Sequence, residues 1–67
     1  MRANREKLMV SMARACMNTD ELAETANMPR PTVNNVITGR SVRPGTLGKI
    51  ARALGVDVEE IMEVSST

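Results

Sequence analysis

Aromatic residues and histidine are missing from this 67-residue chain, and Cys16 is its only cysteine. A lone thiol excludes an intrachain disulfide, and without histidine it cannot build a structural zinc site. No apolar run is long enough to span a membrane, and the basic N-terminus is not followed by the apolar stretch of a secretory signal. The sequence therefore predicts one cytoplasmic domain over residues 1–67, with no membrane partner, metal, cofactor or evident small-molecule ligand.

The hydrophobic core must be built without aromatic side chains, and six methionines partly replace them. A domain of this size buries only about 60% of its unfolded surface, so helix packing must stabilise it, and dimerisation can add to that stability. Cys16 is expected to be a small buried hydrophobe near the end of a helix, with a redox sensor as the alternative.

Charge is unevenly distributed, although the net charge is only +1. Residues 30–52 contain five basic residues and no acidic one, whereas residues 57–63 contain four acidic residues and no basic one. This asymmetry indicates a basic surface for a polyanion, and the alternative is scattered solvated charge. No carboxylate pair lies on an apolar face and no glycine-rich phosphate loop is present, so an enzyme is not predicted.

The spacing of apolar residues and the capping signals predict an all-α fold with five helices. The first covers about residues 4–15. The second begins at Asn18, which can form a capping box with Glu21, and it ends before Asn27, a residue that tolerates the left-handed conformation.

Proline and glycine mark the ends of the next two helices, over about residues 30–38 and 44–54. Asp57 and Glu60 suggest a second capping box, which predicts a short fifth helix containing Val58 and residues 61–62.

The predicted third helix has an apolar side and an uncharged polar side. Val33, Val36 and Ile37 form the apolar side, and the polar side carries Thr32, Asn34, Asn35 and Thr38. Short amide and hydroxyl side chains on an exposed helix suit the edges of base pairs, and an asparagine amide can bind adenine through two hydrogen bonds. Residues 18–36 therefore predict a helix-turn-helix that reads DNA.

Several segments together carry a family resemblance: residues 20–24, 31–33, 43–44, 49–56 and 61–62, with Gly39 and Leu47. Over about residues 5–63 the chain resembles the Cro and lambdoid-repressor (Xre) type of helix-turn-helix protein. The resemblance implies five helices, with the second and third forming the DNA-binding unit and the third lying in the major groove.

The resemblance also implies two groups of DNA-contacting residues. Base reading is expected of Arg30, Pro31, Asn34, Asn35 and Thr38. Phosphate binding is expected of Asn18, Thr19, Thr32, Arg40 and Arg43. Arg30 can reach either guanine or a phosphate. For Lys49 and Arg52, a solvent-exposed helix face is an equally good interpretation as a contact with DNA.

The sequence departs from the family pattern in two places that bear on packing. Cys16 stands where a glycine often ends the first helix, so the turn there is expected to be built differently. Met12 and Ile37 replace a buried Arg–Glu pair of the family with two apolar side chains, which are expected to touch.

We interpret the chain as a transcriptional regulator that binds double-stranded DNA at a pseudo-palindromic operator as a homodimer. The candidate dimer surface comprises Val56, Val58, Ile61, Met62 and Val64. An antitoxin or protein-interaction adaptor on the same scaffold is the alternative, although few residues beyond the predicted core are left for a toxin-binding segment. A recombination accessory protein would bind DNA through the same surface.

Overall fold

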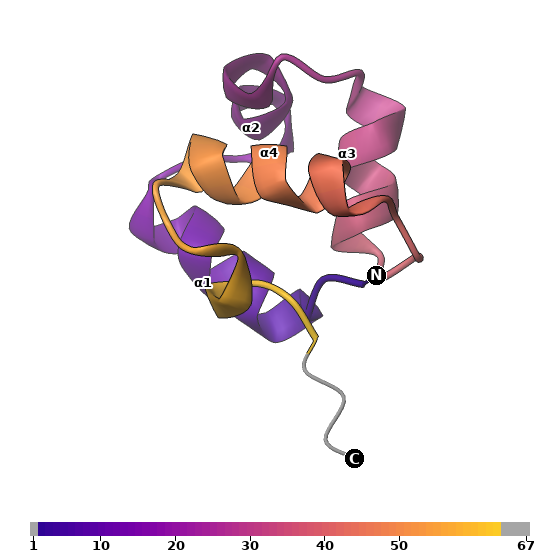
Figure 1. Ribbon diagram of the computed structural model, residues 1–67. Coiled ribbons are helices and arrows are strands. Elements are labelled where there is room, and N and C mark those ends of the chain that lie inside the picture. The colour runs from indigo at the N-terminus through magenta and orange to yellow at the C-terminus, as the bar shows by residue number, and fades with distance from the viewer. Residues whose placement is uncertain (1, 64–67) are drawn as a thin grey trace.

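The described residues of a computed structural model, 2–63, form four α-helices and one short 3-10 helix (Figure 1). These elements are α1 (Arg5–Arg14), α2 (Thr19–Ala26), α3 (Arg30–Ile37), α4 (Pro44–Leu54) and η1 (Val58–Glu60). The predicted all-α class is confirmed, and the four α-helices lie where the sequence placed them. No helix within residues 2–63 has the length and apolar character needed to cross a bilayer.

The prediction of a fifth α-helix is wrong, because residues 58–60 form only a 3-10 turn. The carboxylate of Asp57 accepts a hydrogen bond from the backbone N–H of Glu59, at 3.1 Å. The expected capping box, with Glu60 at the third position, is not formed.

Pairing between the two ends of the described chain explains why this helix stops. The segment before α1 forms an antiparallel bridge with the segment after η1. The N–H of Asn4 donates to the carbonyl of Ile61 at 2.7 Å, and the N–H of Glu63 donates to the carbonyl of Arg2 at 2.9 Å. Backbone groups that would continue a fifth helix are therefore used to hold the N-terminal segment.

The core lies where α4 crosses the molecule between α2 and α1 (Figure 1). Helix α2 packs against both α3 and α4, while α1 packs against α3 and η1. The largest fully buried side chains come from the four α-helices and from the residue after η1: Leu8, Leu22, Val33, Val36, Leu47, Ile50 and Ile61. The core thus fixes the back of α3, and the opposite side of that helix is left exposed.

All four α-helices end in the same hydrogen-bonded turn. In each, a residue with positive φ donates its N–H to the carbonyl three residues earlier, and the next residue donates to the carbonyl five residues before itself. This is the Schellman motif, which satisfies carbonyl groups at the end of a helix. The four residues in the left-handed conformation are Cys16, Asn27, Gly39 and Gly55.

Cys16 corrects two expectations from the sequence. Its φ is 56°, so the turn after α1 is built in the same way as a glycine-ended turn, with cysteine accepting the left-handed conformation. Its side chain is exposed rather than buried. An L-residue in this conformation brings Cβ close to the following carbonyl, and the position therefore carries backbone strain.

Candidate nucleic-acid interface

The exposed and buried sides of α3 divide as the sequence predicts. Val33 and Val36 are fully buried. The five expected base-reading residues are all exposed: Arg30, Pro31, Asn34, Asn35 and Thr38. At 100° per residue these five positions span an arc of roughly 140° around the helix axis. The helix therefore presents a continuous surface of amide, hydroxyl and guanidinium groups, broken only by the apolar ring of Pro31.

A capped helix start and a tight turn define the boundaries of α2 and α3 and the short connection between them. The predicted capping box at the start of α2 is confirmed: the N–H of Glu21 donates to Oδ1 of Asn18 at 2.8 Å, and the N–H of Asn18 donates to Oε1 of Glu21 at 3.1 Å. Asn27 forms the left-handed turn with φ 55°, and α3 begins directly after Pro29. This arrangement is a helix-turn-helix whose second helix is exposed along its outer side.

The exposed amides and the hydroxyl on α3 differ in what they can offer a base. Asn34 and Asn35 carry exposed side-chain amides, each with two donors and an acceptor. The hydroxyl of Thr38 lies 2.9 Å from the carbonyl of Asn34 and 3.2 Å from that of Asn35, and it donates back into the helix. Thr38 is therefore left with its methyl group and its oxygen lone pairs for a partner.

Arg30, at the first position of α3, lies in an ion pair with α2. Its Nε is 2.8 Å from Oδ1 of Asp20, and the two side chains are 64% and 62% exposed. No other ion pair is found within residues 2–63. The sequence predicts that Arg30 contacts DNA, but it carries no signal for this ion pair, because Asp20 is indicated there only as an acidic residue near a helix N-terminus.

The expected phosphate-binding residues differ in their exposure and in how many of their hydrogen-bonding groups are already used within the protein. The backbone N–H and Oδ1 of Asn18 are both used in the capping box, so its side-chain NH₂ is the donor that remains. Thr19 and Thr32 are half-buried. Arg40 and Arg43 are exposed, and the N–H of Arg40 is fixed on the carbonyl of Asn35 at 3.1 Å.

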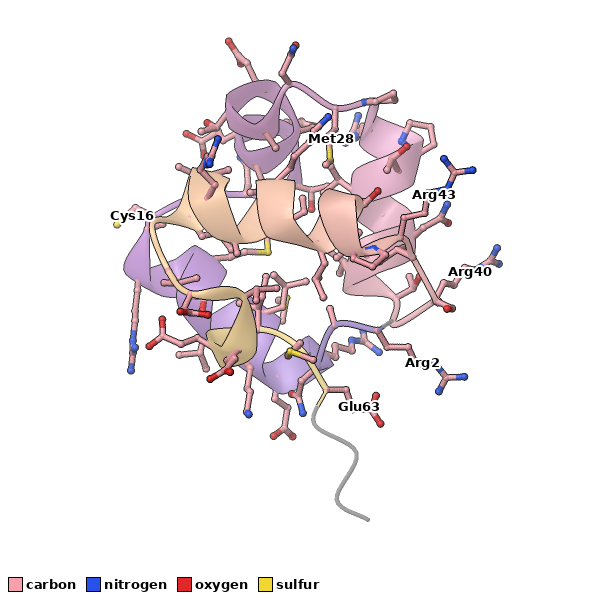
Figure 2. All side chains as sticks on the ribbon, viewed as in Figure 1. Arg2, Cys16, Met28, Arg40, Arg43 and Glu63 are labelled. Atoms are coloured by element: carbon pink, nitrogen blue, oxygen red, sulfur yellow. The ribbon has the colours of Figure 1, made fainter. Side chains whose placement is uncertain are left out.

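Arg2 is a candidate that the sequence analysis missed. Figure 2 shows Arg2, Arg40 and Arg43 projecting from the same edge of the molecule, the edge formed by α3. Arg2 is placed there because its carbonyl accepts the N–H of Glu63. The sequence gives no periodic signal for residues 2–4, and the contact that fixes them spans almost the whole chain.

The candidate dimer residues are distributed between surface and core. Val56, Val58 and Met62 are half-buried and line the side of the core near η1. Ile61 is 0% exposed, so it stabilises this chain's own core and offers no surface to a partner. Val64 lies outside the described residues.

Comparison with known proteins identifies the class to which this arrangement belongs. A family model for the Cro/C1-type HTH DNA-binding domain matches residues 7–66, nearly the whole chain. The chain therefore belongs to this family, as the resemblance predicted. Neither a curated protein nor a solved structure matches the chain significantly.

Proposed function

We propose that this protein is a transcriptional regulator that reads a specific operator with the exposed side of α3. The observation that carries the proposal is the composition of that side. Five exposed residues, none of them acidic, lie opposite a buried valine pair on a short helix that follows a tight turn. A recognition helix in the major groove reads base edges with amide, hydroxyl and basic side chains, and acidic charge facing phosphate would oppose its binding.

Asn35 and Arg30 are the principal base-reading residues in this proposal. The Asn35 amide can accept from the N6 amino group of adenine and donate to N7, whereas Arg30 can donate two bonds to guanine. The two residues are five positions apart, which corresponds to about 7.5 Å along the helix at 1.5 Å per residue. With base pairs stacked about 3.4 Å apart, we expect the adenine and the guanine about two steps apart.

Phosphate binding in this proposal comes from exposed arginines beside α3. Arg40 and Arg43 follow the recognition helix, and Arg2 projects from the same edge (Figure 2). Lysine and arginine contacts to phosphate release counterions, so they add affinity for any sequence and make binding depend on salt. Thr19, Thr32 and the free amide of Asn18 would supply uncharged donors to the same backbone.

A homodimer would place two such helices on one side of the duplex. Half-sites on such an operator are about 34 Å apart, one helical turn of DNA. The half-buried apolar residues Val56, Val58 and Met62 remain the candidates for the contact, because they border the core without being closed inside it.

Base preference and salt dependence together test the proposal. Operator sequences are selected from random DNA with the wild type, with Asn35→Ala and with Arg43→Ala. Asn35→Ala should lose the preference for adenine at one position, because it removes a bidentate contact worth about 1–3 kcal/mol. Arg43→Ala should keep the selected sequence, weaken every site about equally and lower the salt slope by roughly 1. An unchanged preference in Asn35→Ala would show that another face reads the DNA.

The dimer is tested separately with a Met62→Lys variant on full and half operators. A charge in an apolar contact should reduce cooperative occupation of the full site while half-site affinity stays close to wild type. Two independent and equal binding steps on the full site in the wild type would exclude the dimer.

A further inference from the structure

The ion pair between Asp20 and Arg30 joins the two helices of the helix-turn-helix at the start of the recognition helix. Asp20 lies in the first turn of α2, and Arg30 is the first residue of α3. Both side chains are largely exposed, so the pair contributes little to folding stability. An acidic side chain here also opposes the approach of a polyanion. Asp20 favours the start of α2 through the helix dipole, but neither that effect nor general DNA affinity explains its contact with Arg30.

The atoms in contact indicate what Asp20 does. The carboxylate lies against Nε of Arg30, on the side of the guanidinium group. An arginine binds guanine through a fork of two donors directed at O6 and N7. The contact engages Nε and restrains the planar group, and the guanidinium has four further donors on Nη1 and Nη2.

We propose that Asp20 is a positioning residue, which orients the guanidinium group of Arg30 so that it binds guanine rather than phosphate. This inference rests on the proposed function, since it concerns the same reading face. A free arginine is attracted by any phosphate within reach, whereas an arginine paired with a carboxylate has lost most of its net attraction to a point charge. Guanine and phosphate can both accept two bonds from the guanidinium fork, but the neutral base depends less on the net charge of the arginine than phosphate does, so pairing with Asp20 weakens the phosphate contact more than the guanine contact.

The proposal predicts opposite effects on specificity and on general affinity. Asp20→Asn should lower the preference for guanine at the position read by Arg30, by up to the full discrimination of such a contact, about 5- to 150-fold. Binding to non-operator DNA should become tighter and more salt-dependent, because one negative charge is removed and Arg30 is free to bind phosphate. Arg30→Ala should lose the same guanine preference.

Glu24→Gln is the matched control. Glu24 is an exposed acidic residue on the same helix, and no ion pair joins it to Arg30. Glu24→Gln removes the same charge as Asp20→Asn. A change in affinity or in guanine preference that both variants show is therefore caused only by long-range electrostatics. The double variant Asp20→Asn with Arg30→Ala completes a cycle, and its guanine preference should be no lower than that of Arg30→Ala alone. Thermal unfolding of each variant establishes that the differences do not come from loss of folding.

The experiment is site selection from random DNA, followed by titration of the selected operator and of its guanine-substituted versions. Loss of guanine preference in Asp20→Asn and Arg30→Ala, with retention in Glu24→Gln, supports the proposal. Equal effects of Asp20→Asn and Glu24→Gln on all sequences overturn it. Retained guanine preference in Arg30→Ala also overturns it, and a loss of adenine preference in Asn35→Ala would then show that operator reading by α3 still holds. A wild type that selects no sequence overturns the proposed function and this inference together.

Discussion

Replacing Cys16 with glycine should stabilise the protein, because cysteine occupies a left-handed position at the end of α1. Its φ of 56° is favourable for glycine and costs other L-residues about 1–2 kcal/mol. Glycine loses more backbone entropy on folding, which offsets about 0.5–1 kcal/mol of that gain. The thiol is exposed, so little packing is lost. The two ranges differ by about 0–1.5 kcal/mol, so the net expectation for Cys16→Gly is a gain near the midpoint, about 0.75 kcal/mol.

The gain should be measurable as a shift of the thermal midpoint. For a domain of 60–100 residues, 1 kcal/mol corresponds to about 4–8 °C, so a gain of about 0.75 kcal/mol should raise Tm by about 3–6 °C. The measurement is thermal unfolding by circular dichroism, with a reductant present because an exposed thiol can form disulfides between molecules. Urea unfolding gives the same comparison at constant temperature.

Two further variants separate backbone strain from other effects of the thiol. Cys16→Ala removes sulfur but keeps Cβ, so it should not raise Tm. Asn27→Gly changes a residue with nearly the same φ, 55°, but asparagine tolerates this conformation, so little strain is relieved and Tm should rise less than in Cys16→Gly or not at all. If Cys16→Gly and Cys16→Ala have equal stability, the strain inferred at this turn does not exist.

Four other predictions follow from packing and charge. Met12→Arg should cost about 3–5 kcal/mol because Met12 is buried, and Ile37→Glu should cost less because Ile37 is half-buried. The double variant should recover much of the loss, as urea unfolding will measure. Ile61→Ala should cost about 2–5 kcal/mol in the same assay, because that side chain is fully buried. Arg2→Ala should lower the salt slope of DNA binding by roughly 1 without changing the selected sequence. Arg40→Met should lower the slope similarly and leave Tm unchanged or higher, since methionine suits the turn that ends a helix.

Two of these predictions have a specific control: additivity for the Met12 and Ile37 pair, and a matched loss of charge for the DNA-binding variants. Met12 and Ile37 line one hollow on the surface, between α1 and the end of α3, so strictly additive losses would mean that they are not coupled. Arg14→Gln is the charge control for the two DNA-binding variants, because Arg14 lines a hollow with the acidic Glu59 and Glu60. If Arg14→Gln lowers the salt slope as much as Arg2→Ala does, Arg2 has no specific contact with phosphate.

Local signals explain why most of the fold could be predicted from the sequence. Asn18 with Glu21 marks the start of α2, and the apolar spacing of Val33 and Val36 identifies the buried side of α3. These signals act between residues a few positions apart, so they can be recognised without knowledge of the tertiary structure. The exposed side of α3, and with it the expected base-reading surface, follows from the same periodicity.

Long-range contacts explain what the sequence did not predict. The fifth helix does not continue because the N–H of Glu63 donates to the carbonyl of Arg2, a residue at the other end of the chain, and not to the carbonyl four residues earlier. Arg2 reaches the edge of α3 through the same pairing. The ion pair of Asp20 with Arg30 joins residues on two different helices, and neither shows a local pattern that would indicate it.

The same Schellman turn ends all four α-helices, but the residue that follows its left-handed position differs between the turns that pack against the core and the turn beside the proposed reading surface. The residue after the left-handed position is apolar and packs against the core at three of the turns: Met17, Met28 and Val56. A hydrophobic contact there commonly accompanies the motif. At the end of α3 the same position is Arg40, which is exposed, although its backbone N–H makes the same bond as in the other turns. The backbone geometry therefore does not require arginine, and packing would favour an apolar residue. A cation at this one turn, beside the proposed reading surface, is the choice expected if the position contributes to binding phosphate rather than to the core.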